Sequence, residues 1–297
     1  IRPSTKIHKQ RIYRLYIKET LGHKIIEEIT NLDILKWHSF ILSKNFQPSF
    51  SRSIHNQLTA VFNHAVRYYD LKENPMHKTE AIGSEKHEPI KVWTQDEFDT
   101  FIKVVDNPLY KMSFITLFYT GIRIGELIAL KYKDVNLEKG HLDINQTARF
   151  IKGEYIFSQP KTKTSKRIVT LPSFLVKLFK DYLNTFENLE EDDQIFKTCK
   201  NKMWYYMDLY SKRAKINKIR IPDLRHSHAS LLINQGIQPI IVQERLGHDT
   251  IQTTLRTYAH LYPNKQYELA AFIDDIVTNK ISEQVNTNSV LMIDTTQ

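Results

Sequence analysis

Four separated segments of the chain carry side chains that together could cleave a phosphodiester. They are Thr120–Leu127, Pro160–Lys163, Asp223–His226 and Leu246–Tyr258. In chain order they supply a cation, an amine, a second cation, an imidazole and a phenol: Arg123, Lys161, Arg225, His248 and Tyr258. A phenol has an ordinary pKa of about 10. A tyrosine nucleophile therefore needs help in losing its proton, and the phosphate that it attacks needs its charge neutralised.

The two arginines suit the non-bridging oxygens of a phosphate, because a guanidinium is planar, bidentate and always charged. Arg123 and Arg225 each lie at a predicted helix start, where free backbone N–H groups and the helix dipole favour an anion. A lone helical arginine is more often part of a surface ion pair, and Tyr258 is one of 15 tyrosines. Only the combination of these residues indicates a site for phosphodiester cleavage.

Composition indicates a polyanionic partner and excludes several protein classes. Lysine and arginine number 42 against 33 acidic residues, which gives a net charge of +9 and a pI near 9.3. The length of 297 residues suits two domains. The single cysteine, Cys199, excludes an intramolecular disulfide and fits a reducing cytoplasm. No apolar run approaches the roughly 18–20 residues of a membrane span, and no signal peptide is visible. The chain begins at Ile1, so we expect preceding residues to have been removed.

The chain divides into two predicted domains. Residues 1–80 are expected to form a helical domain, 81–91 a linker, 92–278 a second domain and 279–297 a C-terminal tail. A helix over Ser51–Tyr69 should bury one apolar face, made of Ile54, Leu58, Val61, Phe62, Ala65 and Val66. The opposite face is polar and includes Arg52, Asn56 and Arg67. It fits a DNA-reading surface and a solvated face equally well.

In the second domain, the spacing of apolar residues is first typical of helices and then of strands. Thr94–Glu97 is a capping box that opens a helix reaching about Val105. Helices near 109–119 and 124–130 precede alternating segments that predict an antiparallel sheet of about three strands. The predicted strands are Val135–Leu137, His141–Asn145, Glu154–Phe157 and Arg167–Leu171. Further helices are expected near 173–187, 202–216, 222–235, 238–246, 250–257 and 263–278. The fold class is therefore mainly α with a small antiparallel β-sheet (α+β).

These motifs resemble the tyrosine recombinase family, and in particular the integrases of Gram-positive phages and conjugative transposons. The resemblance lies in Thr120-Gly121-x-Arg123-x-Gly125-Glu126-Leu127, in the Lys-Thr turn, in Asp223-Leu224-Arg225-His226-Ser227-His228-Ala229-Ser230, and in Leu246-Gly247-His248 with Tyr258 ten residues later. It covers essentially the whole chain. It implies a core-binding domain and a catalytic domain that form a C-shaped clamp on DNA.

The resemblance also implies residue roles. Tyr258 would attack the phosphate and leave a 3′-phosphotyrosyl link. A hairpin lysine, Lys161 with Lys163 as the alternative, would protonate the leaving 5′ oxygen. Arg123 and Arg225 would hold the scissile phosphate. Two further residues would assist, Glu126 by bracing the site and His248 by hydrogen bonding to the phosphate. The candidate DNA contacts are Arg52, Asn56, Arg67, Lys163 and Lys166.

One position departs from the family pattern. The family usually has histidine three residues before the second arginine, and this chain has Pro222. Proline fits the first turn of a helix but cannot donate, accept or shuttle a proton. Activity is therefore expected to be reduced, altered or maintained by a neighbour. His226 and His228 belong to the usual pattern and are expected to be structural, with His228 the better substitute because it shares a helical face with Arg225.

The expected function is site-specific recombination of double-stranded DNA through a Holliday junction, without metal or cofactor. The expected assembly is a homotetramer on DNA and a monomer or weak oligomer when free, with an excisionase or a host DNA-bending factor as further partners. The apolar run Val290–Ile293 suggests that the tail docks on a neighbouring protomer. The alternatives are a type IB topoisomerase-like relaxing activity and a catalytically impaired DNA-binding protein.

Overall fold

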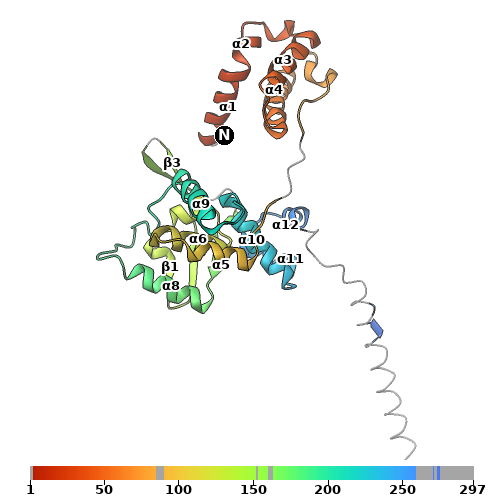
Figure 1. Cartoon of the computed structure of the whole chain (residues 1–297). Coiled ribbons are helices and arrows are strands. Elements are labelled where there is room, and N and C mark those ends of the chain that lie inside the picture. Colours follow the sequence, from red (N-terminus) through yellow and green to blue (C-terminus); the bar gives the residue numbers. More distant parts are fainter. Residues whose placement is uncertain are drawn as a thin grey trace, which may run out of the picture. The chain divides into compact units, whose positions relative to one another are not determined.

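A computed structural model describes residues 3–84, 90–151, 153–159, 163–258, 270 and 273–274. The chain separates into two compact units, Ile1–Pro89 and Ile90–Gln297, and the division falls inside the predicted linker (Figure 1). Each unit has its own apolar core. The predicted tail, 279–297, and most of the predicted helix 263–278 lie outside the described residues.

The first unit is helical. Its elements are α1 (Pro3–Tyr16), α2 (Lys18–Leu21), η1 (Ile26–Glu28), α3 (Asn31–Ser43), α4 (Pro48–Tyr68) and η2 (Pro75–Lys78). Helix α3 starts after Thr30, whose side chain forms a capping box with Asp33. Helix α4 starts three residues earlier than predicted, with Pro48 in its first turn.

The predicted apolar face of α4 was partly wrong. Ile54, Leu58 and Phe62 are buried, but Val61 is 51% exposed and Val66 is 39% exposed. Helix α4 therefore packs through a narrower stripe, and the polar residue His55 is buried beside the apolar ones.

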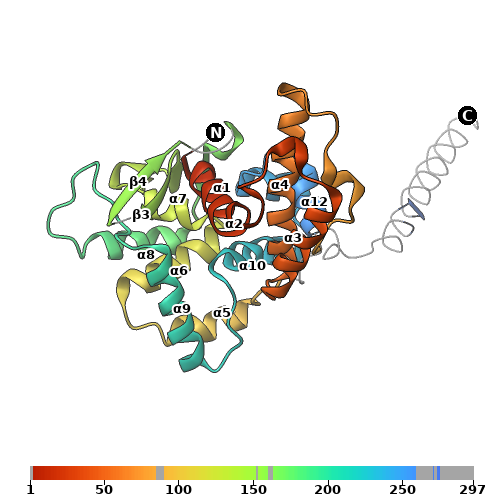
Figure 2. The same cartoon turned by 90° about the horizontal axis from the view of Figure 1, so that it is seen from above.

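Most of the described part of the second unit is helical. Its helices are α5 (Gln95–Lys103), α6 (Pro108–Thr120), α7 (Ile124–Ala129), α8 (Ser173–Leu183), α9 (Lys200–Ala214), α10 (Ile221–Asn234), α11 (Pro239–Leu246) and α12 (Ile251–Tyr258), with short 3₁₀ turns η3 (Tyr132–Asp134) and η4 (Lys163–Ser165). The predicted capping box of Thr94 and Glu97 is confirmed. Helices α6 and α10 pack together at the centre of the unit (Figure 2).

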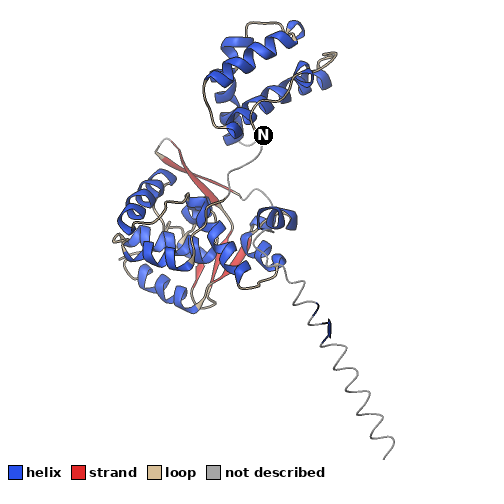
Figure 3. Cartoon of the chain, turned by 45° about the vertical axis from the view of Figure 1, so that its right-hand side comes forward, coloured by secondary structure: helices blue, strands red, loops and turns tan. Residues whose placement is uncertain are grey.

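The strands form two separate sheets. Strands β1 (Val135–Asn136), β2 (His141–Ile144) and β5 (Arg167–Thr170) make a three-stranded antiparallel sheet in the order β1-β2-β5. Strands β3 (Thr147–Ile151) and β4 (Glu154–Ser158) pair only with each other. The sequence missed β3 and wrongly placed β4 in the first sheet. Figure 3 shows the strands as a minor part of a largely helical unit, which confirms the predicted fold class.

Two helices of the second unit end in a glycine with a left-handed backbone conformation. Gly121 ends α6 with φ +66° and Gly247 ends α11 with φ +65°, a left-handed conformation that side chains disfavour. A Cβ on Gly121 would meet the His228 ring at 2.6 Å, and one on Gly247 would meet Arg167 at 3.0 Å. Both turns therefore let another chain segment approach closely.

In the part of the chain that the structure describes, no helix has the length and apolar character needed to cross a bilayer. The same residues contain no cluster of histidine, cysteine or carboxylate side chains suited to a metal ion.

Candidate active site

A buried carboxylate between two arginines forms one side of the site. Glu126 Oε1 accepts a hydrogen bond from Arg123 Nη1 at 2.8 Å, and Glu126 Oε2 accepts one from Arg167 Nη2 at 3.0 Å. Burial alone would raise the pKa of Glu126, but the charges of Arg167 and Arg123 outweigh it and hold that pKa below its ordinary value. Glu126 therefore stays ionised and fixes both guanidinium groups.

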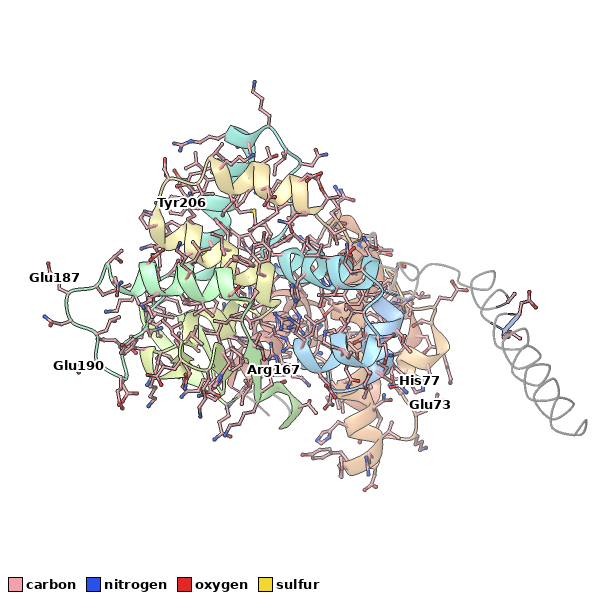
Figure 4. The ribbon with its side chains drawn as sticks, turned by 90° about the horizontal axis from the view of Figure 1, so that it is seen from below. Glu73, His77, Arg167, Glu187, Glu190 and Tyr206 are labelled. Atoms are coloured by element: carbon pink, nitrogen blue, oxygen red, sulfur yellow. The ribbon has the colours of Figure 1, made fainter. Side chains whose placement is uncertain are left out.

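The Arg123 and Arg167 side chains differ in exposure. Arg167 is 7% exposed and also donates to the backbone oxygens of Arg245 and Ser165, at 2.8 and 3.2 Å. Arg123 is 42% exposed, and its Nη2 reaches the Gly247 oxygen at only 3.3 Å. Arg123 is therefore available to an incoming anion, whereas Arg167 is a bracing residue. Figure 4 labels Arg167, where β5 meets the blue ribbon of α11.

Arg225 is a buried cation held by the two glycine turns. Its Nη1 donates to Gly121 O at 2.7 Å and its Nη2 to Leu246 O at 2.6 Å. Desolvation, followed by the nearby charge of Arg123, lowers the pKa of Arg225 to about 9. A buried cation that is bonded to carbonyls and repelled by a second arginine favours the binding of an anion.

His248 follows Gly247 and lies within the field of the same arginines. Its Nδ1 is 2.8 Å from Thr254 Oγ1 on α12. Burial, and then the charges of Arg225 and Arg123, lower the pKa of His248 to about 3. The imidazole is therefore neutral at physiological pH and can form a hydrogen bond with a phosphate.

Tyr258 ends α12 and is buried, with 1% of its surface exposed. Its hydroxyl lies 2.5 Å from His226 Nδ1 on α10. Burial raises the pKa of Tyr258 above its ordinary value, and the charge of Arg225 only partly offsets this. The phenol therefore keeps its proton in this state.

His228 is placed differently from the expectation that it substitutes for Pro222. It is 3% exposed, and its Nε2 accepts a hydrogen bond from Arg245 Nε at 2.9 Å. Pro222 itself lies in the first turn of α10, as predicted. His228 thus supports the packing of α10 against α11, and the tyrosine hydroxyl contacts His226 instead.

Of the remaining predicted residues, three belong to the second unit and three to the first. Lys161 lies outside the described residues, and Lys163 begins η4. Lys166 is exposed beside β5. In the first unit, Asn56 and Arg67 are exposed on α4, and Arg52 Nη2 donates to Gly83 O at 3.1 Å.

Two residues that contact the predicted site were not predicted from the sequence to belong to it: Arg167 and His226. Arg167 was predicted only as the start of a strand, and His226 was expected to be structural. The signals available were a strand-starting arginine shortly after the Lys-Thr turn and a histidine four residues after Pro222.

The site has a net positive charge beside a phenol. Arg123, Arg167 and Arg225 face one carboxylate, Glu126. Such a site can bind a phosphodiester, stabilise the charge that develops on its oxygens and offer a tyrosine oxygen as nucleophile.

Comparison with known proteins gives the family. The sequence profile described as the phage integrase family matches residues 91–265. The ICEBs1 integrase of Bacillus subtilis is 30% identical, over 93% of this chain and 79% of its own length. A XerC-like tyrosine recombinase of Caldanaerobacter subterraneus is 27% identical, over 93% of this chain and 78% of its own.

Solved structures share the fold. The Tn1549 transposon integrase in complex with a circular intermediate DNA matches with a TM-score of 0.77 and 18% identity, over 93% of this chain and 94% of that one. A lambda integrase dimer bound to a COC' core site matches with a TM-score of 0.64 and 16% identity, over 86% and 89%. The profile match covers more than half of the chain, and the chain therefore belongs to the phage integrase family and is a tyrosine recombinase, an enzyme that cleaves DNA and transfers strands.

Proposed function

We propose that this chain is the site-specific integrase of a mobile genetic element and that Tyr258 is its nucleophile. The position of Tyr258 supports the proposal most directly. Its hydroxyl is close enough to Arg225 to feel that charge, and Tyr258 ends α12, the helix whose Thr254 is hydrogen-bonded to His248. Relatives named as integrases, a recombinase and a transposase favour strand exchange over simple relaxation of DNA.

The proposed chemistry assigns one task to each group. Arg123 and Arg225 hold the non-bridging oxygens of the scissile phosphate, and His248 adds a hydrogen bond to the same phosphate. Tyr258 attacks the phosphorus, a 3′-phosphotyrosyl bond forms and the 5′ oxygen leaves. Lys161, or Lys163 in its place, gives the leaving oxygen its proton. The phosphotyrosyl bond conserves the energy of the broken bond, so rejoining needs no cofactor.

Because the Tyr258 hydroxyl is buried, DNA binding has to open the site before attack. The substrate is double-stranded DNA at attachment sites, in the bacterial cytoplasm. The solved relatives bound to a circular intermediate and to a core site support a DNA partner. Four protomers on two DNA sites, with an excisionase or a DNA-bending factor, complete the proposed assembly.

The test is a suicide substrate nicked near the cleavage site, which traps the covalent adduct. Tyr258→Phe should abolish the adduct and leave DNA affinity nearly unchanged, because only the nucleophilic oxygen is removed. Arg123→Ala should raise the activation free energy of cleavage by about 3 kcal/mol, because it removes a donor that stabilises the charge of the transition state. Holliday junctions formed by the wild type would separate recombination from relaxation.

The rival nucleophile is Tyr262, which lies outside the described residues. An adduct that persists in Tyr258→Phe and disappears in Tyr262→Phe would contradict the assignment of Tyr258.

A further inference from the structure

The Tyr258 hydroxyl is in contact with His226, a histidine whose expected role was structural. His226 Nδ1 lies 2.5 Å from the hydroxyl oxygen, and the two rings are tilted by 54° with centroids 5.6 Å apart. The neighbouring imidazoles are engaged elsewhere, since His228 bonds Arg245 and His248 bonds Thr254. Among the described residues, His226 is the histidine with a ring nitrogen on the tyrosine hydroxyl.

The position of His226 on α10 explains how it could take over from Pro222. The two positions are four residues apart in the same helix, so they lie on one face, about one turn from each other. His228 is six residues from Pro222 and points to another side of the helix, where it meets Arg245. His226 is therefore better placed than His228 to do the work of the histidine that is absent from position 222.

The surroundings of His226 set its protonation state. Burial lowers the pKa of His226 below its ordinary value; Asp223 acts in the opposite direction, and Arg225 and Arg220 add to the lowering. His248 is also within electrostatic range. At neutral pH, His226 is neutral, and the tautomer with its proton on Nε2 leaves Nδ1 free to accept the phenolic hydrogen.

We infer that His226 is a catalytic residue that accepts the Tyr258 proton during strand cleavage. The inference rests on the proposed function above. In the forward step, the bond from the tyrosine oxygen to phosphorus forms, the bond from phosphorus to the 5′ oxygen breaks, and the phenolic proton moves to His226 Nδ1. The 5′ oxygen takes its proton from the hairpin lysine. In the rejoining step, a 5′-hydroxyl attacks the phosphorus and gives its proton back to the neutral Lys161 or Lys163. The bond from phosphorus to the tyrosine oxygen breaks, and the imidazolium returns its proton to that oxygen.

The first test measures single-turnover adduct formation by the full chain on the nicked substrate between about pH 5 and 8. His226→Asn places a polar atom near the Nδ1 position but cannot take up the proton. It should cleave about 10²–10⁴-fold more slowly. The wild-type rate should fall as the pH drops through the His226 pKa, and this fall should be absent in His226→Asn.

The matched control is His228→Asn, on the same helix. It removes the bond to Arg245 and should lower the melting temperature while the pH profile keeps its shape. DNA affinity and melting temperature are measured for every variant, and His226→Gln replaces His226→Asn if the latter does not fold.

The second test separates the nucleophile from the leaving group. A substrate with a bridging sulfur at the 5′ position has a thiolate leaving group, which departs without a proton. This substrate should restore cleavage to Lys161→Ala or Lys163→Ala and leave His226→Asn slow.

Two results would overturn the inference. One is restoration of His226→Asn by the sulfur substrate, which would place His226 on the leaving-group side. The other is a His226→Asn variant that cleaves as fast as the wild type, or faster, with the same pH profile. A wild type that forms no adduct on either substrate would instead refute the proposed function itself.

Discussion

At the residue scale, the site depends on one buried carboxylate that holds two arginines. Glu126 is 4% exposed, and its charge is balanced by Arg167 from β5 and by Arg123 from its own helix start. Removing Arg167 leaves the buried Glu126 with Arg123, which is partly exposed, as its remaining charged partner, and this costs more than the loss of a surface pair. Arg167 therefore supports the position of Arg123 through Glu126.

This arrangement predicts a large loss of stability in Arg167→Met. The free energy of unfolding should fall by about 3–5 kcal/mol, because Glu126 keeps its charge in a buried position. Urea unfolding of the second unit measures the change. The control is Lys212→Met, which removes an exposed i,i+4 pair with Asp208 and should cost less than about 0.5 kcal/mol. Similar small losses in both variants would show that Arg167 does not brace the carboxylate.

The residue types of the site could be predicted from the sequence, but their partners could not. Arg123, Arg225, His248 and Tyr258 stand in motifs whose order is visible along the chain. The contact of Arg167 with Glu126 joins residues 41 positions apart, and that of His226 with Tyr258 joins residues 32 positions apart. Such contacts depend on how β5 and α12 pack, which local patterns do not specify.

At the element scale, the ends of α6 and α11 determine where the arginines point. Each helix ends in a left-handed glycine, and the carbonyls at these ends bind Arg225. The conformation alone favours glycine, but at Gly247 the space is also filled by Arg167.

Two glycine variants separate these effects. Gly236→Ala, at φ +77° with no atom within 4 Å of the new Cβ, should cost only the strain of about 1–2 kcal/mol. Gly247→Ala, at φ +65°, should cost more and should also slow adduct formation, because Arg167 atoms at 3.0 Å must shift. Thermal unfolding and the nicked-substrate assay measure the two quantities. Equal stability losses with normal cleavage in both would rule out a close fit at Gly247.

Elements with local signals were predictable, and those without were not. The helix starts at Thr94 and Asn107 have capping side chains that can be recognised from sequence alone. Strand β3 was missed because its sequence does not alternate clearly: Ala148 is buried against α7, but Arg149 and Phe150 are both exposed. The exposed Val61 and Val66 show that an apolar stripe can be wider than the surface available to cover it.

At the scale of the whole molecule, the net charge of +9 suits binding to DNA, which both units are expected to contact. Each phosphate neutralised by lysine or arginine releases bound counterions, so affinity should fall as salt rises. The candidate contacts on α4 differ in how freely their side chains can bind a phosphate. Arg67 is exposed near the end of the helix, whereas Arg52 donates to the Gly83 carbonyl within its own unit.

The last prediction concerns this salt dependence, measured with the full chain on a duplex attachment site. With about six to ten phosphate contacts, affinity should drop by about 10³–10⁵ between 50 and 200 mM salt. Arg67→Ala should reduce the slope of log affinity against log salt by about one, as expected for the loss of one phosphate contact. Arg52→Ala should change the slope less, because Arg52 has a partner within its own unit. A wild-type affinity that stays constant over this range would mean that the positive charge does not face phosphates, and a larger slope change for Arg52→Ala than for Arg67→Ala would reverse the assignment on α4.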